Sequence, residues 1–131
     1  MRTIYLAGAI NGCTDAEAYN WRDKVRSHFY LLGIAKLKDP MVRDYRGRED
    51  ACCAEIVELD KRDIRESDIL LVRWTKPSVG TSMEVLYAFE RDIPIILWVD
   101  PGATISPWLR YHASLIVSDF KLAMEKLENY L

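Results

Sequence analysis

The stretch ILLVRWTKPSVGTSME, residues 69–84, combines a strand, a loop and the start of a helix. Its first part, Ile69–Trp74, is apolar enough to be buried on both faces of a sheet, as strands of parallel sheets are. The loop Thr75–Gly80 follows, and an apolar helical segment from about Ser82 to Arg91 comes next. The pattern therefore predicts a buried strand whose carboxyl end leads into a helix that begins near Glu84.

Glu84 falls in the first turn of this predicted helix. A helix N-terminus carries partial positive charge, which keeps a nearby carboxylate ionised and available for chemistry. The same residues fit a second interpretation. Thr81-x-x-Glu84 matches a capping box, in which the Glu84 side chain only accepts a hydrogen bond from the backbone N–H of Thr81. Local sequence leaves both interpretations open.

Strands and helices alternate on both sides of this stretch. The predicted strands are Ile4–Ala7, Ile34–Leu37, Ile69–Trp74, Pro94–Val99 and Leu115–Val117. The other predicted helices are one that is capped by Asp15 and ends at Gly33, one from about Glu49 to Glu66, a short one at Trp108–His112, and one that begins at Phe120. This alternation predicts one domain over residues 1–131, a flavodoxin-like three-layer α/β sandwich with a parallel sheet in the order 2-1-3-4-5.

Composition excludes several classes of protein. Of 131 residues 50% are apolar, and 18 basic residues against 20 acidic ones give a net charge of −2. This balance indicates no general affinity for nucleic acid or for an anionic membrane, and no segment resembles a signal peptide or a membrane span. The three cysteines, Cys13, Cys52 and Cys53, lack the spacing of a zinc site. We therefore expect no disulfide, no metal and a cytoplasmic location.

The predicted strand order also indicates where a ligand binds. In open parallel sheets, ligands lie beyond the carboxyl ends of the strands, near the point where the strand order reverses. Here that point lies between the first and third strands, and its loops are Gly8–Thr14 and Thr75–Gly80. Glu84 follows the second loop, and Tyr5 lies near the end of the first strand. The sequence thus places Tyr5, the glycine-containing loop and Glu84 around one crevice.

Five short stretches occur in a fixed order along the chain. They are YLAG (residues 5–8), ELD (58–60), SDILLV (67–72), PSVGTSME (77–84) and IPII (93–96). In this order and spacing they resemble the nucleoside 2-deoxyribosyltransferase family, which includes the 2'-deoxynucleoside 5'-monophosphate N-hydrolases. The resemblance covers about residues 3–117.

The resemblance implies cleavage of an N-glycosidic bond without a metal or an organic cofactor. A glutamate of the family attacks C1' of the sugar, and its match is Glu84. An upstream acid contacts the sugar or the departing base, and its match is Asp60, for which a plain surface acid is the alternative. The family tyrosine that orients the nucleophile or the sugar matches Tyr5, for which a plain core side chain is the alternative. The 5' end of the substrate would lie against Gly8, Ile10, Asn11 and Gly80.

Two further positions concern the 5'-phosphate. Six residues before the nucleophile the transferases typically carry an acid, whereas the monophosphate hydrolases carry a serine, and this chain has Ser78. A hydroxyl can bind a phosphate dianion that a carboxylate would repel. The hydrolases also use a serine from a neighbouring subunit, which matches Ser106, with Arg110 as an additional positive charge. The resemblance therefore implies a homodimer or higher homo-oligomer with shared active sites.

The chain departs from the hydrolases in the first glycine loop, where it has Ala9 and Asn11 instead of serine and arginine. Arg43, Arg46 and Arg48 are candidates to replace the missing arginine or to recognise a base. The plainer interpretation is that they are solvated, and for any one of them it is favoured.

The predicted function is therefore release of the base from a nucleoside or its 5'-monophosphate through a covalent glycosyl–Glu84 intermediate. Two alternatives remain open at this stage. One is transfer of a deoxyribosyl group between bases, and the other is a non-catalytic nucleotide-binding module, because a fold does not fix a function. Hydrolysis of a larger nucleotide is a third, weaker alternative.

Overall fold

The computed structural model describes all residues, 1–131, and contains five strands, five α-helices and one short 3₁₀ helix. The strands are β1 (Arg2–Gly8), β2 (Ala35–Lys38), β3 (Ile69–Trp74), β4 (Ile95–Val99) and β5 (Leu115–Val117). The helices are α1 (Asp15–Leu32), α2 (Cys53–Arg65), α3 (Val79–Phe89), α4 (Pro107–His112) and α5 (Phe120–Glu128), and the 3₁₀ helix η1 spans Pro40–Val42. No helix is both long and apolar enough to cross a membrane.

All strand pairs are parallel, and the strand order is β2-β1-β3-β4-β5. The predicted fold class and strand order are therefore confirmed. In the register of the central pair, Tyr5 of β1 lies beside Leu70 of β3, and Gly8 lies beside Arg73. The carboxyl ends of β1 and β3 consequently meet at the same edge of the sheet, where the strand order reverses.

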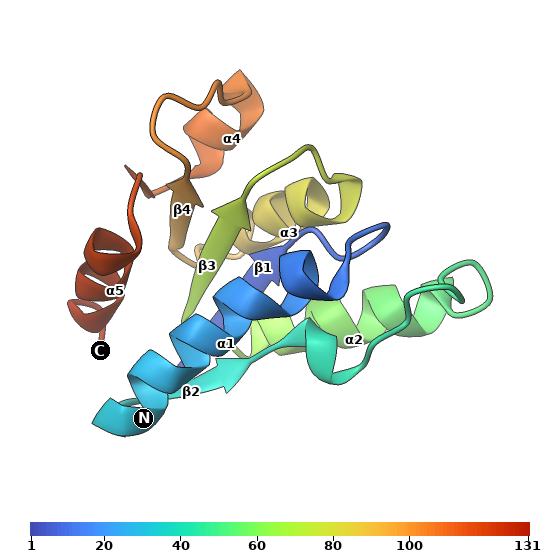
Figure 1. The fold of residues 1–131 in the computed structure, drawn as a ribbon, viewed down its shortest axis with the longest axis horizontal. Coiled ribbons are helices and arrows are strands. Elements are labelled where there is room, and N and C mark those ends of the chain that lie inside the picture. The colour runs from blue at the N-terminus through green and yellow to red at the C-terminus, as the bar shows by residue number, and fades with distance from the viewer.

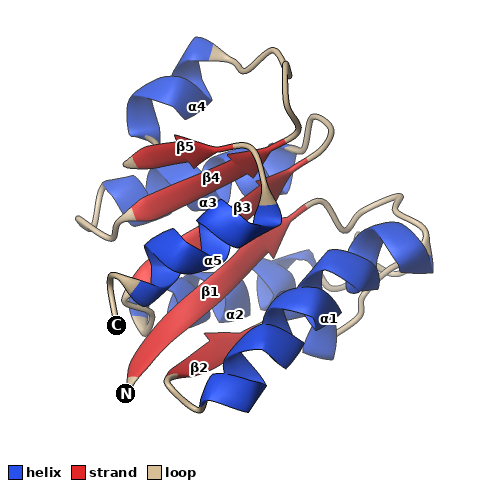
Figure 2. Ribbon diagram, turned by 60° about the vertical axis from the view of Figure 1, so that its left-hand side comes forward, coloured by secondary structure: helices blue, strands red, loops and turns tan.

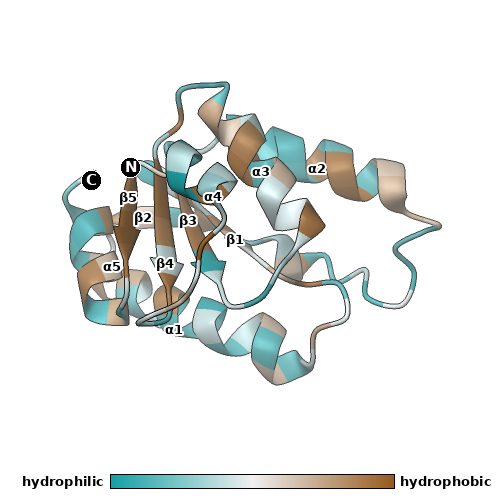
Figure 3. Cartoon of the chain, turned by 90° about the horizontal axis from the view of Figure 1, so that it is seen from above, coloured by the Kyte–Doolittle hydropathy of each residue, from teal (hydrophilic) through white to brown (hydrophobic).

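Helices cover both faces of the sheet (Figures 1 and 2). On one face, α1 and α5 bury Val25, Phe29 and Leu127 against Ile4, Leu6 and other strand residues. On the opposite face, Ile64 of α2, Val85 of α3 and Leu109 of α4 pack against the alternate strand positions. Figure 3 shows the strands as the most hydrophobic layer, with polar helix surfaces outside them. The central strands are buried on both faces because each successive side chain meets a helix layer.

The first helix differs from its prediction at the start. Its N-cap is Thr14 and not Asp15, because Thr14 and Glu17 form a reciprocal capping box, with Glu17 N–H donating to Thr14 Oγ1 at 3.2 Å and Thr14 N–H to Glu17 Oε1 at 3.0 Å. The helix ends as predicted at Gly33, which adopts a left-handed conformation with φ of 63° and so favours glycine.

The predicted start of α3 was wrong by one helical turn. The helix begins at Val79, and Ser78 is its N-cap, with Ser78 Oγ accepting a hydrogen bond from Thr81 N–H at 3.3 Å. Thr81 therefore lies inside the helix, and the Thr81–Glu84 capping box does not form. Glu84 lies in the second turn, where the charge of the helix terminus has largely declined. Whatever controls the ionisation of Glu84 must come from side chains on other elements.

Helix α2 also starts later than predicted, at Cys53 instead of about Glu49. The residues before it form η1 and turns. We call Asp39–Arg48 the arginine segment. Asp39 caps η1 by accepting from Met41 N–H at 2.9 Å, and Met41 is buried.

Arg22 of α1 is fully buried, which is uncommon for a charged side chain. Its guanidinium donates to Leu6 O at 2.8 Å, to Gly8 O at 3.1 Å and to Asp39 Oδ1 at 3.2 Å. A buried arginine is tolerated when its donors are satisfied and its charge is paired. Arg22 thus ties the carboxyl end of β1 to the start of the arginine segment.

Candidate active site

Glu84 and Tyr5 form the centre of the candidate site. Tyr5 projects from β1 and is fully buried, and its hydroxyl donates a short hydrogen bond to Glu84 Oε2. Glu84 is half-buried and reaches this contact from α3, 79 positions along the chain. A buried tyrosine hydroxyl normally requires such a partner. The contact fixes the Glu84 carboxyl at the carboxyl end of the sheet.

Burial and, to a smaller extent, the negative charge of Asp60 raise the pKa of Glu84 to about 8, against the opposing effects of the Tyr5 hydrogen bond and the positive charge of Arg22. The same burial, with the charges of Glu84 and Asp60, raises the pKa of Tyr5 well above its usual value, so Tyr5 remains a donor. The raised pKa favours the protonated form of Glu84 at neutral pH.

Asp60 of α2 is the second acid of the site. Its side chain is 22% exposed, and burial raises its pKa to about 6, with Arg43 opposing the shift and Asp63 adding to it. Two carboxyl groups whose pKa values are raised in one cavity are typical of functional sites. Between pH 6 and pH 8 the pair carries about one proton, because the two groups titrate as a unit.

A cavity of about 730 Å³ contains both acids and most of the residues that the sequence predicted to bind substrate. The predicted residues on its wall are Gly8, Ile10, Asn11, Asp60, Ser78, Gly80 and Glu84. They come from both loops at the switch point and from α2 and α3. Its volume falls in the range of ordinary small-molecule sites.

Two of these residues also have structural roles. A Cβ atom at Gly8 would lie 2.7 Å from Cζ2 of Trp21 and 3.2 Å from Arg73 O, so glycine is required there for close packing. The Ser78 hydroxyl donates to Thr81 Oγ1 at 2.9 Å while it caps α3. Binding of a phosphate by Ser78 would share or replace that bond. Gly80, by contrast, has open space where a Cβ would lie.

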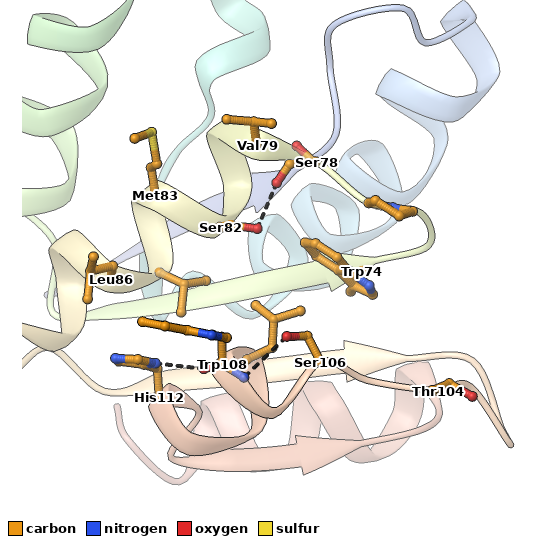
Figure 4. A pocket seen from close by; sticks show the side chains of 13 residues that line it. Trp74, Ser78, Val79, Ser82, Met83, Leu86, Thr104, Ser106, Trp108 and His112 are labelled. Atoms are coloured by element: carbon orange, nitrogen blue, oxygen red, sulfur yellow. Dashed lines mark hydrogen bonds between the residues drawn. The ribbon is translucent and has the colours of Figure 1, made fainter.

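Ser106 and Arg110 do not join this cavity. Ser106 caps α4 and lies on a separate cleft of about 590 Å³ between α3 and α4. Figure 4 shows this cleft, with Trp108 and His112 of α4 on one side and Leu86 of α3 on the other. Arg110 is exposed and contacts neither cavity. Within one chain the two residues are therefore separate from Glu84.

Sequence reasoning missed the pairing of the arginine segment and the burial of Arg22. Arg43 and Arg46 are ion-paired and line the cavity, so the favoured interpretation of them as solvated side chains was wrong. Only the type and number of arginines before α2 could have indicated this role. The structure contains no group of three or more His, Cys, Asp or Glu side chains that could hold a metal ion.

Comparison with known proteins adds to this geometry. No protein-family model matches the chain. A curated relative from Syntrophotalea carbinolica, named "Putative 2'-deoxynucleoside 5'-phosphate N-hydrolase 1", is 40% identical over 50 residues, which are 38% of this chain and 35% of that protein. The match thus spans about a third of the length of the relative. The predicted resemblance is confirmed.

Solved structures with the same fold carry related names. One is a 2-deoxyribosyltransferase from Bacillus psychrosaccharolyticus, with a TM-score of 0.75, 17% identity, and coverage of 98% of this chain and 92% of that chain. Another is a CMP N-glycosidase from Clostridium botulinum, with a TM-score of 0.61, 20% identity, and coverage of 97% and 99%. At such identities the likeness shows the fold, and the chemistry of this chain has to be argued from its own residues.

Proposed function

We propose that this protein is an N-glycosidase that releases the base from a nucleoside 5'-monophosphate or nucleoside. The observation that carries the proposal is the coupling of two carboxyl groups, Glu84 and Asp60, in one cavity at the switch point of the sheet. The names of the relatives support the same reaction class. Carboxylate pairs are the usual means of cleaving glycosidic bonds, because the transition state develops positive charge at the anomeric carbon.

In the proposed reaction, a carboxylate oxygen of Glu84 forms a bond to C1' as the C1'–N bond breaks, and the electron pair of that bond leaves with the base. The base takes its proton from Asp60. A water molecule then attacks C1', the bond from C1' to Glu84 breaks, and the Glu84 carboxylate is restored. The proton that this water loses returns to Asp60, so atoms and charges balance over the cycle.

The reaction requires Glu84 ionised and Asp60 protonated, which is one proton on the pair. The empty site holds one proton in the pH range between the two pKa values, mainly on Glu84. Movement of this proton to Asp60 would need no exchange with solvent, because the total charge of the pair stays the same. Tyr5, as a permanent donor, would hold the ionised Glu84 oxygen in place.

The 5' end of the substrate would lie at the N-terminal turn of α3, against Ser78 and Gly80, with the loop residues Gly8, Ile10 and Asn11 opposite. Ser106 would come from a second subunit, because in its own chain it lies on the other cleft. A mixing experiment tests this arrangement. Ser106→Asp keeps a good N-cap for α4 but repels a phosphate.

The Ser106→Asp and Glu84→Gln proteins are mixed in equal amounts, so that some dimers contain one subunit of each. If sites are shared, one site of such a mixed dimer carries both substitutions and the other site carries neither. Random pairing should then restore about a quarter of the wild-type rate. Mixed protein that stays inactive, although the subunits exchange, would show that Ser106 does not complete the site of a neighbour.

The central test is a panel of ribo- and deoxyribonucleosides and their 5'-monophosphates, with free base measured by chromatography. We expect base release by the wild type and none above background by Glu84→Gln, which keeps the volume of the side chain and an acceptor for Tyr5. Undiminished release by Glu84→Gln would eliminate the mechanism. Release that rises when a second free base is added would favour deoxyribosyl transfer, and tight binding without release would favour a binding module.

A further inference from the structure

Two arginines of the arginine segment line the same cavity but differ in how their donors are used. Arg46 engages all its guanidinium nitrogens: Nε donates to Asp44 at 3.0 Å, Nη1 to Cys13 O at 3.1 Å and Nη2 to Asp15 at 2.7 Å. Its role is to fasten the segment to the first loop. Arg43 engages only Nη2, which donates to Asp63 at 2.7 Å and to Asp60 at 3.4 Å.

The Nε and Nη1 donors of Arg43 therefore have no acceptor in the protein. No buried side-chain nitrogen or oxygen lacks a partner, so these donors lie on accessible surface, and Arg43 lines the cavity that contains Glu84. Arginine carries its donors in one rigid plane, so fixing one nitrogen restricts the direction of the others.

Asp63 is the anchor of Arg43. Its side chain is only 3% exposed, and it also accepts from Arg62 at 2.9 Å. Because the Asp63 carboxylate is buried and accepts from both Arg43 and Arg62, its position is fixed. Arg43 is thus held firmly at Asp63 and touches Asp60 more loosely. The contacts run from Asp63 to Arg43 to Asp60, so the guanidinium of Arg43 lies beside the acid assigned to the departing base.

We propose that Arg43 binds the departing base through its free Nε and Nη1 donors, and that the substrate therefore carries a base with a carbonyl oxygen or ring nitrogen facing them. The inference rests on the proposed function. When the C1'–N bond breaks, its electron pair passes to the base and increases the negative charge on those acceptor atoms. A guanidinium remains charged at any working pH and stabilises this charge with strong hydrogen bonds.

The test compares wild type and Arg43→Gln on pairs of compounds. Each pair is the best substrate of the panel and one analogue in which a single carbonyl oxygen or ring nitrogen of the base is replaced by C–H. Removing the correct acceptor should lower kcat of the wild type roughly 10- to 100-fold, the usual effect of a hydrogen bond to a charged group. Arg43→Gln should show only the intrinsic difference between the two leaving groups, because the interaction is already lost.

The two-by-two design cancels intrinsic differences between leaving groups, which affect both proteins alike. Arg46→Gln is the matched control. It comes from the same segment and cavity wall, but it should leave the ratio between substrate and analogue at its wild-type value. Arg43→Lys, which keeps the charge and loses the planar fork, should lie between wild type and Arg43→Gln.

The outcomes separate the two proposals. If the wild type releases base and Arg43→Gln slows the substrate and every analogue by one common factor, Arg43 only positions Asp60 and the present inference is overturned, while the proposed function stands. If the wild type releases no base from any compound, the proposed function fails, and the role of Arg43 fails with it.

Discussion

On the side of α3 that faces α2, the cavity wall contains Glu84, Asp60 and Arg43; on the side that faces α4, the cleft contains Trp74, Trp108 and Leu109. Both hollows share Pro77, Ser78, Val79, Met83 and Leu86, so they adjoin along the same helix. Figure 4 shows the α4 side, where the rings of Trp108 and His112 stack with an interplanar angle of 8°.

The difference follows from what the neighbouring elements contribute. Toward α2, the buried Tyr5 hydroxyl and the Asp60 carboxyl surround Glu84 with polar groups of altered pKa. Toward α4, exposed large side chains such as Trp108, at 73%, make an apolar surface with one histidine as its only ionisable group. We infer that one side of α3 serves chemistry and the other serves packing or association.

The largest expected effect comes from Glu84→Gln, compared with Ser82→Ala on the α4 side of the same helix. Loss of the nucleophile should reduce base release on the order of 10³-fold or more. Ser82→Ala removes only a hydroxyl that donates to Ser78 O at 2.8 Å and should retain most activity. The measurement is kcat/KM on the best substrate. Equal losses in both variants would contradict the division between the two sides of α3.

Asp60→Asn should have the next largest effect. An asparagine cannot donate a proton to the departing base, so kcat should fall about 10²-fold, the common contribution of a general acid. KM should change much less. The opposite pattern, a raised KM with an unchanged kcat, would assign Asp60 to substrate binding alone.

The pH dependence of kcat/KM should be bell-shaped, with limbs at about 6 and about 8. Below the lower limb both acids are protonated and Glu84 cannot attack. Above the upper limb both are ionised and Asp60 cannot donate, so only the singly protonated pair is active.

In Asp60→Asn the falling limb should disappear. The rising limb of that variant should then report Glu84 alone, with its midpoint below pH 8, because Asp60 no longer raises the pKa of Glu84. A profile that remains bell-shaped in Asp60→Asn would assign the second limb to another group.

A smaller effect is expected on stability. The pKa of Glu84 is about 8 in the folded protein and ordinarily 4.5. Between these values the folded state binds the proton more tightly than the unfolded chain, so the wild type loses stability as the pH rises from about 4.5 to 8. The Glu84→Gln variant does not lose this stability. The melting temperature of the variant minus that of the wild type, measured by calorimetry, should therefore be at least about 3 °C larger at pH 8.5 than at pH 5. A constant difference would mean that Glu84 titrates normally.

The smallest effect on the ionisation of Glu84 and Asp60 is expected from the α4 side. Trp108→Ser should weaken self-association, measured by sedimentation, because it removes an exposed aromatic side chain from the apolar cleft. The pH limbs should remain where they are in wild type. A shift of either limb would show that the cleft influences the ionisation of Glu84 and Asp60.

Much of the fold follows from local pattern. The strand Ile69–Trp74 and the strand Leu115–Val117 have the bounds that their apolar runs predict, and Gly33 ends α1 as expected. The start of α3 did not follow, because Ser78 and Thr81 are both good cap residues and periodicity cannot choose between them. The tertiary structure decides for Ser78, because Thr81 is buried inside the helix, at 2% exposure, and donates its N–H to Ser78 Oγ.

The candidate site shows the same limit. The order of Tyr5, the loop Gly8–Thr14 and Glu84 already indicates one crevice, because parallel strands bring their carboxyl ends to one edge. Asp60 was assigned only by the family resemblance. The sequence does not reveal that Arg22 is buried beneath that edge. A charged residue on a helix is predicted to be exposed unless the groups that pair with it are known.

By itself, then, the chain determined the alternation of strands and helices, the strand order and the place of Glu84 beside the switch point, since periodicity and parallel connections are local and general. Only the tertiary structure decided which hydroxyl holds Glu84, which acid anchors Arg43 and on which side of α3 Ser106 lies. Those contacts join residues 20 to 79 positions apart. Ionisation depends on burial and on neighbouring charge, and both are properties of the folded molecule.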